Sequence, residues 1–324
     1  RIFQLVWVAW DILSFFISMG SVPSTKCCSP CASEDLPIEG ESYPMLCIKM
    51  STFLQLDRLI SHAELRSRAL LIKPWPQASV HFVSHEWLSS THPDPSSVHL
   101  RRLQEIFRDI SAGNVRKLFT DKDWSTIAQG RWSRLVQPWG DEQEDTRVSE
   151  ASLQRSVDHG LIWIDFASVP QMVDLDGASE YARSSKLATR SIPNYMNRSN
   201  FFWVLAPGAE HADSRSCGFS SWRQRGWCRA EEWANILGKK PLIPFIVTDE
   251  PKISTYDMAP FVIENMNKPE RAPCRGVFSC CKNGHFVEKI VPALRKSTSL
   301  NGTRIPCDKL EIVDMLSKMY RAKL

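Results

Sequence analysis

Hydrophobic residues occur in this chain as short continuous runs separated by longer, more polar stretches. Four such runs stand at residues 78–84, 160–165, 201–206 and 241–247, with the sequences ASVHFVS, GLIWID, FFWVLA and PLIPFIV. Continuous apolar runs of this length are typical of strands buried on both faces. Their wide spacing leaves room for crossover helices, so the pattern predicts an α/β fold: a parallel sheet with helices on both faces.

Two stretches between or beside these runs have helical spacing. Residues 96–110 place apolar side chains on one face, and Ser96 or Ser97 can cap the start of this helix. Residues 225–237, RGWCRAEEWANIL, predict a second helix that ends before Gly238, a suitable C-cap. The polar stretch 114–158 is interpreted as an insertion with some helix.

The remaining segments divide the chain into four parts. Residues 1–20 are mostly apolar over about the length of a bilayer span, although Gln4 and Asp11 count against one. Residues 21–74 predict a linker followed by helix-like sequence. The α/β domain is expected at 75–250, and residues 251–324 form an extension with helices at 286–296 and 308–320. In the last helix Asp308 and Glu311 occupy capping-box positions.

Charge and cysteine usage restrict the functional class. The net charge of +4 comes from 40 basic and 36 acidic residues mixed along the chain, which argues against nucleic acid as a partner. Most of the ten cysteines stand in two groups, 27–47 and 274–307, and a chain of 324 residues needs no disulfides. We therefore expect reduced thiols in a cytoplasmic protein, with a membrane anchor at residues 1–20 as the alternative.

No cofactor or metal site is expected from the sequence. Cys28 and Cys31 form a C-x-x-C pair, but no second pair follows at ligand spacing, and the C-terminal cysteines lack a nearby C-x-x-C or His pair. Glycine-rich phosphate loops, zinc-protease motifs and the hydrolase Ser motif are also missing from the sequence.

Four short motifs carry a resemblance to known families: FVSHEW at 82–87, LIWIDFASVPQ at 161–171, RGWCRAEEWA at 225–234 and PLIPFIVTDEP at 241–251. In order and local chemistry they resemble the fungal heterokaryon-incompatibility (HET) domain and plant-type TIR domains. The resemblance covers about half the chain. It implies a flavodoxin-like fold and an intracellular signalling or defence-type domain that self-associates or binds related domains.

The resemblance also implies two alternative activities. One is NAD glycohydrolase activity, with NAD as substrate rather than cofactor; the other is a non-catalytic protein–protein interaction module. The catalytic glutamate of the Trp-Cys-x-x-Glu motif falls on Glu231, and Trp227 and Cys228 match the residues around it. We count these two and Arg225 among the ligand-binding candidates, because an arginine here could serve a phosphate group.

Helical geometry supports Glu231 independently of the resemblance. On a helical wheel Glu231 lies at the edge of the apolar stripe, whereas Glu232 is expected to point toward solvent. A half-buried carboxylate could stabilise the cation that forms as nicotinamide leaves the ribose. The alternative is a partly buried acid paired with Arg225 or Arg229.

The carboxyl ends of the first two predicted strands supply the other candidates. Ser84, His85, Glu86 and Trp87 follow the first strand, and Asp165 ends the next, at the edge where open α/β sheets bind ligands. These side chains could bind ribose hydroxyls or orient Glu231. Alternatively, Asp165 caps a turn and Trp87 belongs to the core; the resemblance does not extend to His85 or Glu86.

The loop His92-Pro93-Asp94-Pro95 has two interpretations. It would lie at the edge used for self-association in TIR domains, or it is an ordinary turn leading into the helix at residue 96.

Overall fold

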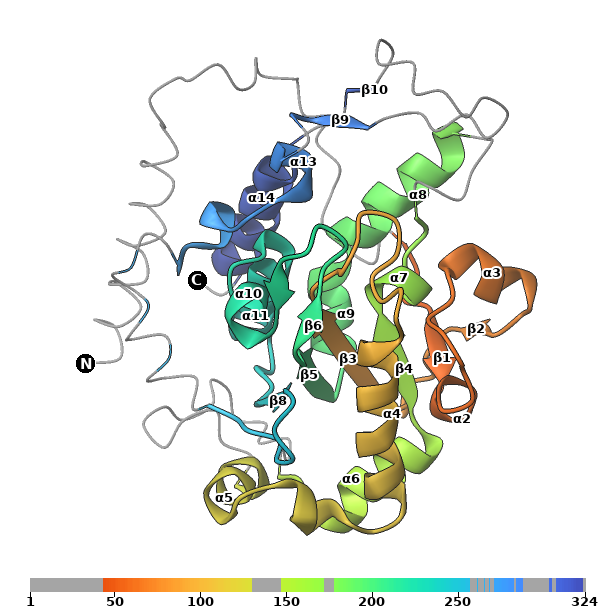
Figure 1. Cartoon of the computed structure of the whole chain (residues 1–324), viewed down its shortest axis with the longest axis vertical. Coiled ribbons are helices and arrows are strands. Elements are labelled where there is room, and N and C mark those ends of the chain that lie inside the picture. Colours follow the sequence, from red (N-terminus) through yellow and green to blue (C-terminus); the bar gives the residue numbers. More distant parts are fainter. Residues whose placement is uncertain are drawn as a thin grey trace.

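The computed structural model describes residues 43–129, 147–171, 178–256, 261, 265, 268, 271–282, 284–287, 303–304 and 307–322. It shows a central sheet with helices packed on both faces (Figure 1). Residues 1–20 and the Cys28–Cys31 pair lie outside the described residues. Within the described part of the chain, no helix has both the length and the apolar character needed to cross a bilayer.

The main sheet has six strands in the order β2-β1-β4-β3-β5-β8. Their bounds are β1 Cys47–Lys49, β2 Leu71–Ile72, β3 Val80–His85, β4 Leu161–Ile164, β5 Phe201–Leu205 and β8 Pro244–Val247. The last four are mutually parallel and correspond to the four predicted apolar runs. From one side of the sheet to the other, these four strands are the second, first, third and fourth parallel strands of the chain. This is the flavodoxin-like order.

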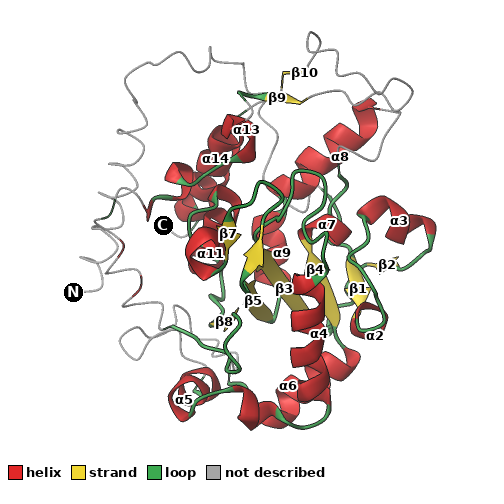
Figure 2. Ribbon diagram, in the orientation of Figure 1, coloured by secondary structure: helices red, strands yellow, loops and turns green. Residues whose placement is uncertain are grey.

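Alternate residues of the central strands face two separate cores. Val83 and Trp203 pack with α2 (Met50–Phe53), α4 (Val98–Ser111) and α6 (Glu150–His159). Phe82 and Phe202 pack on the opposite face with α8 (Ala178–Arg190), α9 (Ile192–Arg198), α10 (Phe219–Trp222) and α11 (Gly226–Leu237). All six β3 residues are buried, as expected for a strand covered by helices on both sides (Figure 2).

The predicted helices at 96–110 and 225–237 are confirmed as α4 and α11, but the cap of α4 differs. Ser97 precedes the helix with a positive φ of 57° and makes no side-chain cap hydrogen bond. Instead, the backbone amide of Leu100 donates to Asp94 Oδ2 at 2.8 Å. Asp94 is fully buried, and its loop turns inward to begin α4, which favours the interpretation of residues 92–95 as a turn.

Two boundaries drawn from the sequence need correction. The sheet begins before residue 75, because β1 pairs with both β2 and β4. The stretch 114–158 is also more than an insertion. It contains a 3-10 helix at Val115–Leu118, α5 (Asp121–Ala128) and α6, and α6 packs Leu153 and Val157 into the core just before β4.

Further short elements complete the described part: α3 (His62–Ser67), α7 (Asp165–Ser168), and the hairpin of β6 (Ala209–Glu210) and β7 (Ser216–Cys217). The C-terminal region contains η4 (Pro273–Arg275), α13 (Ser279–Lys282), β9 (Phe286–Val287), β10 (Thr303–Arg304) and α14 (Asp308–Arg321).

The helix predicted at 308–320 is confirmed as α14, and it packs on α11. Its expected capping box does not form, because Cys307 is the N-cap residue and Glu311 pairs with Arg190 at 3.1 Å. The helix predicted at 286–296 begins instead as strand β9, and its remaining residues lie outside the described part.

Candidate functional site

Ser84 and Asp165 lie at the same edge of the sheet, where β3 and β4 end. Val83 is aligned with Ile164 in the parallel register, so the next residue of each strand reaches the carboxyl edge beside the other. Ser84 accepts a hydrogen bond from Trp222 Nε1 at 3.1 Å and also hydrogen-bonds the side chain of Glu231. The structure therefore brings together Ser84, Asp165 and Glu231 from three separate parts of the chain.

Glu231 is a buried carboxyl group on α11. Only 6% of its surface is exposed. Burial, followed by the negative charge of Asp165, raises the pKa of Glu231 to about 8, and the hydrogen bond with Ser84 only partly opposes this rise. Glu231 is thus mostly protonated at neutral pH. The sequence also allowed an arginine to pair with Glu231. That interpretation is wrong, because the charge that acts on Glu231 is that of Asp165.

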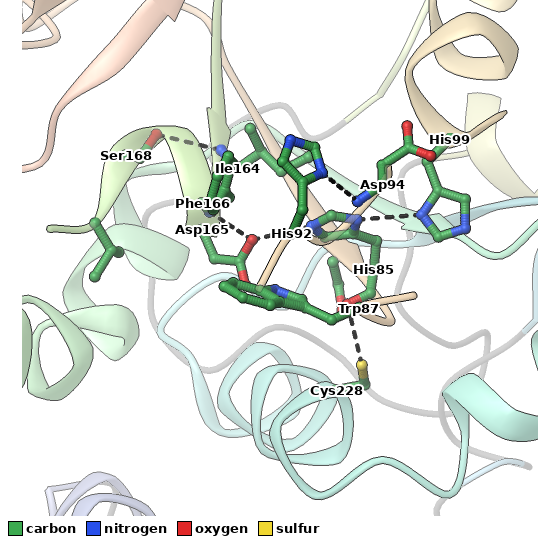
Figure 3. A network of polar contacts seen from close by, with 12 residues as sticks. His85, Trp87, His92, Asp94, His99, Ile164, Asp165, Phe166, Ser168 and Cys228 are labelled. Carbon is green, nitrogen blue, oxygen red and sulfur yellow. Dashed lines mark hydrogen bonds and ion pairs between the residues drawn. The ribbon is translucent and has the colours of Figure 1, made fainter. Parts of the chain in front are cut away.

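Asp165 is the ionised partner of this pair, and Figure 3 shows it beside His85 and Trp87. His85 Nε2 lies 3.0 Å from its Oδ1, Trp87 Nε1 donates to its Oδ2 at 2.7 Å, and the amide of Phe166 donates to Oδ1 at 2.6 Å. Burial alone would raise the pKa of Asp165, but the charge of His85 and these hydrogen bonds outweigh it and hold the pKa below its ordinary value. The side chain keeps 30% of its surface exposed.

His85 orients Asp165 and has both ring nitrogens occupied. Because a carboxylate only accepts, His85 Nε2 must carry the proton it donates to Asp165. The other ring nitrogen, Nδ1, hydrogen-bonds Nδ1 of His99 at 3.2 Å. Burial, aided by the charge of His85, lowers the pKa of His99 to about 3, so His99 stays neutral. His85 is therefore placed to position Asp165, with no nitrogen left for a ligand.

Glu86 and Arg225 form a separate ion cluster. Glu86 is 3% exposed, and Arg215 Nη1, from the segment between β6 and β7, donates to its Oε1 at 2.9 Å. Arg225 Nε lies 4.0 Å from the same oxygen, and Arg225 Nη2 also donates to Ser279 Oγ at 3.0 Å. Both residues were predicted to bind ligand, but their charges are engaged with each other and with Arg215.

Trp227 and Cys228 also have structural contacts of their own. Trp227 Nε1 donates to Asp308 Oδ2 at 2.9 Å, which joins α11 to α14. The thiol of Cys228 donates to the backbone oxygen of His85 at 3.5 Å. Burial, followed by the charge of Glu231, raises the pKa of the Cys228 thiol well above its ordinary value, so it is a poor nucleophile.

Glu232 does not face solvent, contrary to the prediction from the helical wheel. It is 4% exposed and accepts a hydrogen bond from the hydroxyl of Tyr256. Burial raises its pKa, while this hydrogen bond and the charges of Arg223, Arg271 and Arg229 lower it. The helical-wheel prediction was wrong because the sheet covers α11 on one side and α14 covers it on another. Few positions on this helix therefore remain exposed to solvent.

Two cavities in the described part lie apart from this edge. One, of about 640 Å³, is lined by residues of α5 and by the start of α6. The other, of about 540 Å³, is lined by four arginines, Arg223, Arg229, Arg271 and Arg275, together with residues of α10. The second could take an anionic group. Neither cavity is lined by Ser84, Asp165 or Glu231; at the edge itself, the side chain of Asp165 is partly exposed.

Three contributors to the site were missed from the sequence: His99, Arg215 and Trp222. His99 could have been found, because it stands on the buried face of α4 in line with Leu103 and Ile106. Arg215 and Trp222 gave no signal, because they come from short segments without periodicity.

A further group, Cys280, Cys281, His285 and Cys307, gathers near α13 and could hold a metal ion. No protein-family model, curated protein or solved structure matches this chain.

Chemically, the edge combines a protonated acid and an ionised one. Environments that push the pKa values of two neighbouring carboxyl groups apart are a common arrangement for acid–base work. Glu231 can give a proton, or release it when a cation approaches, whereas Asp165 can accept hydrogen bonds from hydroxyl groups. Gln171 lies close by and donates to the backbone oxygen of Asp165 at 3.3 Å, which helps to hold the turn after β4.

Proposed function

We propose that this chain is a TIR/HET-like domain that hydrolyses the nicotinamide–ribose bond of NAD, with Glu231 as its central residue. The observation that carries the proposal is the meeting of Ser84, Asp165 and Glu231 at the carboxyl edge of a flavodoxin-like sheet. This edge is where open α/β sheets bind nucleotides. The resemblance of the four sequence motifs supplies the reaction class.

In this proposal the positive charge of the substrate changes the protonation state of Glu231. The nicotinamide ring of NAD is a cation, so its arrival favours the ionised carboxylate, and Glu231 releases its proton to water. The bond from ribose C1′ to the ring nitrogen then breaks, and the nitrogen keeps the electron pair. The carboxylate of Glu231 stabilises the positive charge that develops on the ribose. Water adds to C1′, and its proton passes to the carboxylate.

Asp165 has the role of holding the ribose. It is ionised, partly exposed, and fixed by His85 and Trp87, so its oxygens can accept hydrogen bonds from ribose hydroxyls. The fixed position matters because a carboxylate that is already oriented loses little freedom when the substrate binds. Self-association, with copies of itself or with related domains, is part of the same proposal and rests on the sequence resemblance alone.

A non-catalytic interaction module is the second candidate. One observation favours it: Ser84 is 1% and Glu231 6% exposed, so a substrate would need some movement of the surrounding side chains to reach them. In that case the polar contacts at the edge serve to join α11 to the sheet. The exposed helix residues Leu310 and Val313, 65% and 37% exposed on α14, would then be a contact surface for a partner.

The deciding experiment measures nicotinamide release from NAD by the full chain at high protein concentration. A fragment that starts at residue 75 is unsuitable, because it lacks β1. Glu231→Gln should abolish release, and Asp165→Asn should lower it strongly. Glu232→Gln is the matched control, because it alters a buried carboxyl on the same helix that bonds Tyr256 rather than Ser84. Absence of release by a folded, assembled wild-type chain would favour the interaction module.

A further inference from the structure

Four side chains with metal-binding atoms gather where α13, the following turn and the start of α14 meet. The ligand atoms of Cys280, Cys281, His285 and Cys307 all lie within 4.8 Å of one another. Cys281 Sγ lies 3.6 Å from His285 Nε2, 3.8 Å from Cys307 Sγ and 3.9 Å from Cys280 Sγ. This region is adjacent to α11 in the fold (Figure 1).

These separations fit a tetrahedral zinc site. With zinc–sulfur bonds of about 2.3 Å and zinc–nitrogen bonds of about 2.0 Å, a regular tetrahedron places sulfurs about 3.8 Å apart and sulfur and nitrogen about 3.5 Å apart. The two sulfur pairs and the sulfur–nitrogen pair measured here agree with those values. A disulfide requires about 2.05 Å between sulfurs, and the described cysteines are all free.

The local backbone brings the four side chains together. Cys280 and Cys281 belong to the short helix α13, and the chain then turns through Gly284 and His285, whose φ angles are both positive, 59° and 63°. A positive φ is uncommon for a residue other than glycine. Backbone hydrogen bonds from His285 to Cys280, 2.7 Å, and from Gly284 to Cys281, 3.2 Å, fold this turn back on the helix.

Cys307 completes the group from a distant part of the sequence. It is the N-cap residue of α14, a 14-residue helix, and makes no side-chain cap hydrogen bond. Thiolates are favoured at a helix N-terminus, where the amide groups and the helix dipole stabilise negative charge. The backbone amide of Asp308 also hydrogen-bonds the Cys280 sulfur. The start of α14 therefore lies beside two of the four sulfur-bearing side chains, Cys280 and Cys307.

We propose that Cys280, Cys281, His285 and Cys307 bind one zinc ion as a structural site. Three thiolates and one imidazole in tetrahedral positions are the ligand set that selects zinc, and four protein ligands leave no open position for a substrate. The spacing of the ligands at 281, 285 and 307 does not match a known zinc motif. They form neither paired C-x-x-C motifs nor a His pair, so the site could not be predicted from the sequence.

The role of this ion is to hold the C-terminal region on α11. Phe278, next to the cysteines, lies so close to Gly226 that a Cβ on this glycine would stand 2.0 Å from its ring. Ile312 and Leu316 of α14 pack with Ala230 and Ala234 of α11. The zinc ion would thus hold α14 and the residues around α13 in place against α11, the helix that carries Glu231. This positioning role does not depend on the proposed hydrolase activity.

Metal analysis of the full chain, purified under reducing conditions, tests the site. The expected result is close to one zinc per chain, falling at least tenfold in Cys307→Ser and in Cys281→Ser. Cys274→Ser and Cys217→Ser are the matched controls and should keep the metal, because neither cysteine belongs to the group. Cobalt added to the metal-free wild type should give the strong visible absorption of a tetrahedral thiolate complex.

A second measurement uses only the wild-type chain, in case the variants fail to fold. Alkylation followed by mass spectrometry should show Cys280, Cys281 and Cys307 protected with zinc and modified after a chelator is added, while Cys274 reacts equally in both samples. The proposal is overturned by a folded, reduced wild type that binds neither zinc nor cobalt. A Cys281–Cys307 disulfide in metal-free protein as isolated would equally overturn it.

Discussion

Asp165 and Glu231 lie close together at the edge of the sheet, where burial, followed by the charge of Asp165, raises the pKa of Glu231 to about 8. Burial would raise the pKa of Asp165, but the charge of His85 and the hydrogen bonds from His85, Trp87 and the amide of Phe166 outweigh it and lower the pKa. One carboxyl is therefore charged and the other mostly neutral at pH 7. This difference leads to measurable effects on stability, whether or not the site is catalytic.

Replacing Glu231 by Gln should stabilise the fold at neutral pH. The folded state keeps the Glu231 proton between pH 4.5 and about 8, whereas the unfolded chain releases it, so this group's contribution to stability falls as pH rises through that window. Gln cannot ionise, so the variant should gain up to about 3 kcal/mol at pH 7. Urea unfolding at about pH 7 and pH 5 measures the gain, which should shrink at the lower pH.

Replacing Asp165 by Asn should lower the pKa of Glu231 without restoring its ordinary value, because burial is the larger cause of the shift. The pH-dependent loss of stability should still begin near pH 4.5, but it should end at a lower pH than in the wild type and be smaller in total. Unfolding free energies measured across this range report the change. In the Glu231→Gln background the same substitution should no longer move that part of the curve; an unchanged movement there would mean that another group is responsible.

His81 should make the fold sensitive to acid. Its side chain is fully buried, Trp203 Nε1 donates to its Nδ1 at 3.0 Å, and its Nε2 bonds the Ser156 oxygen at 3.1 Å. Burial lowers its pKa from 6.5 to about 4. The unfolded chain therefore takes up a proton first, and stability is lost as pH falls from 6.5 toward 4, by roughly 3 kcal/mol in total.

This effect is best measured in the Glu231→Gln variant, because the titration of Glu231 acts in the opposite direction over part of the same range. Replacing His81 by Gln should lower stability at neutral pH and weaken its dependence on pH between about 6.5 and 4. His159 is exposed, and His159→Gln is the matched control that should leave the slope as it was. An equal flattening in both variants would contradict the assignment to His81.

Removing Arg215 should destabilise the fold far more than removing a surface arginine. Arg215→Ala leaves the buried carboxylate of Glu86 without its 2.9 Å partner, which should cost about 3 kcal/mol, with Arg225 at 4.0 Å as the remaining cation. Arg58, 58% exposed and paired with Glu64, is the control, and Arg58→Ala should cost less than about 1 kcal/mol. Adding Glu86→Gln to Arg215→Ala should recover part of the loss in urea unfolding.

The four parallel strands and the helices α4, α11 and α14 could be predicted from the sequence alone. Each of these has a local cause, a continuous apolar run or an apolar face at helical spacing, and each was found at its predicted place. The sequence also placed Ser84 and Asp165 at strand ends, because the end of an apolar run is visible without knowing its neighbours. β1 and β2 escaped prediction, because strands of 3 and 2 residues carry too little periodicity to read.

The chemical properties of these residues, in contrast, depend on their surroundings in the folded chain. The protonation states of Glu231 and Asp165 depend on burial and on each other's charge, and Glu86 is neutralised by Arg215 from a distant segment. Likewise, Cys307 meets Cys281 and His285 only because α14 packs against α11. Electrostatic environment and ligand geometry are set by distances in space between groups far apart in sequence, and no local pattern records those distances.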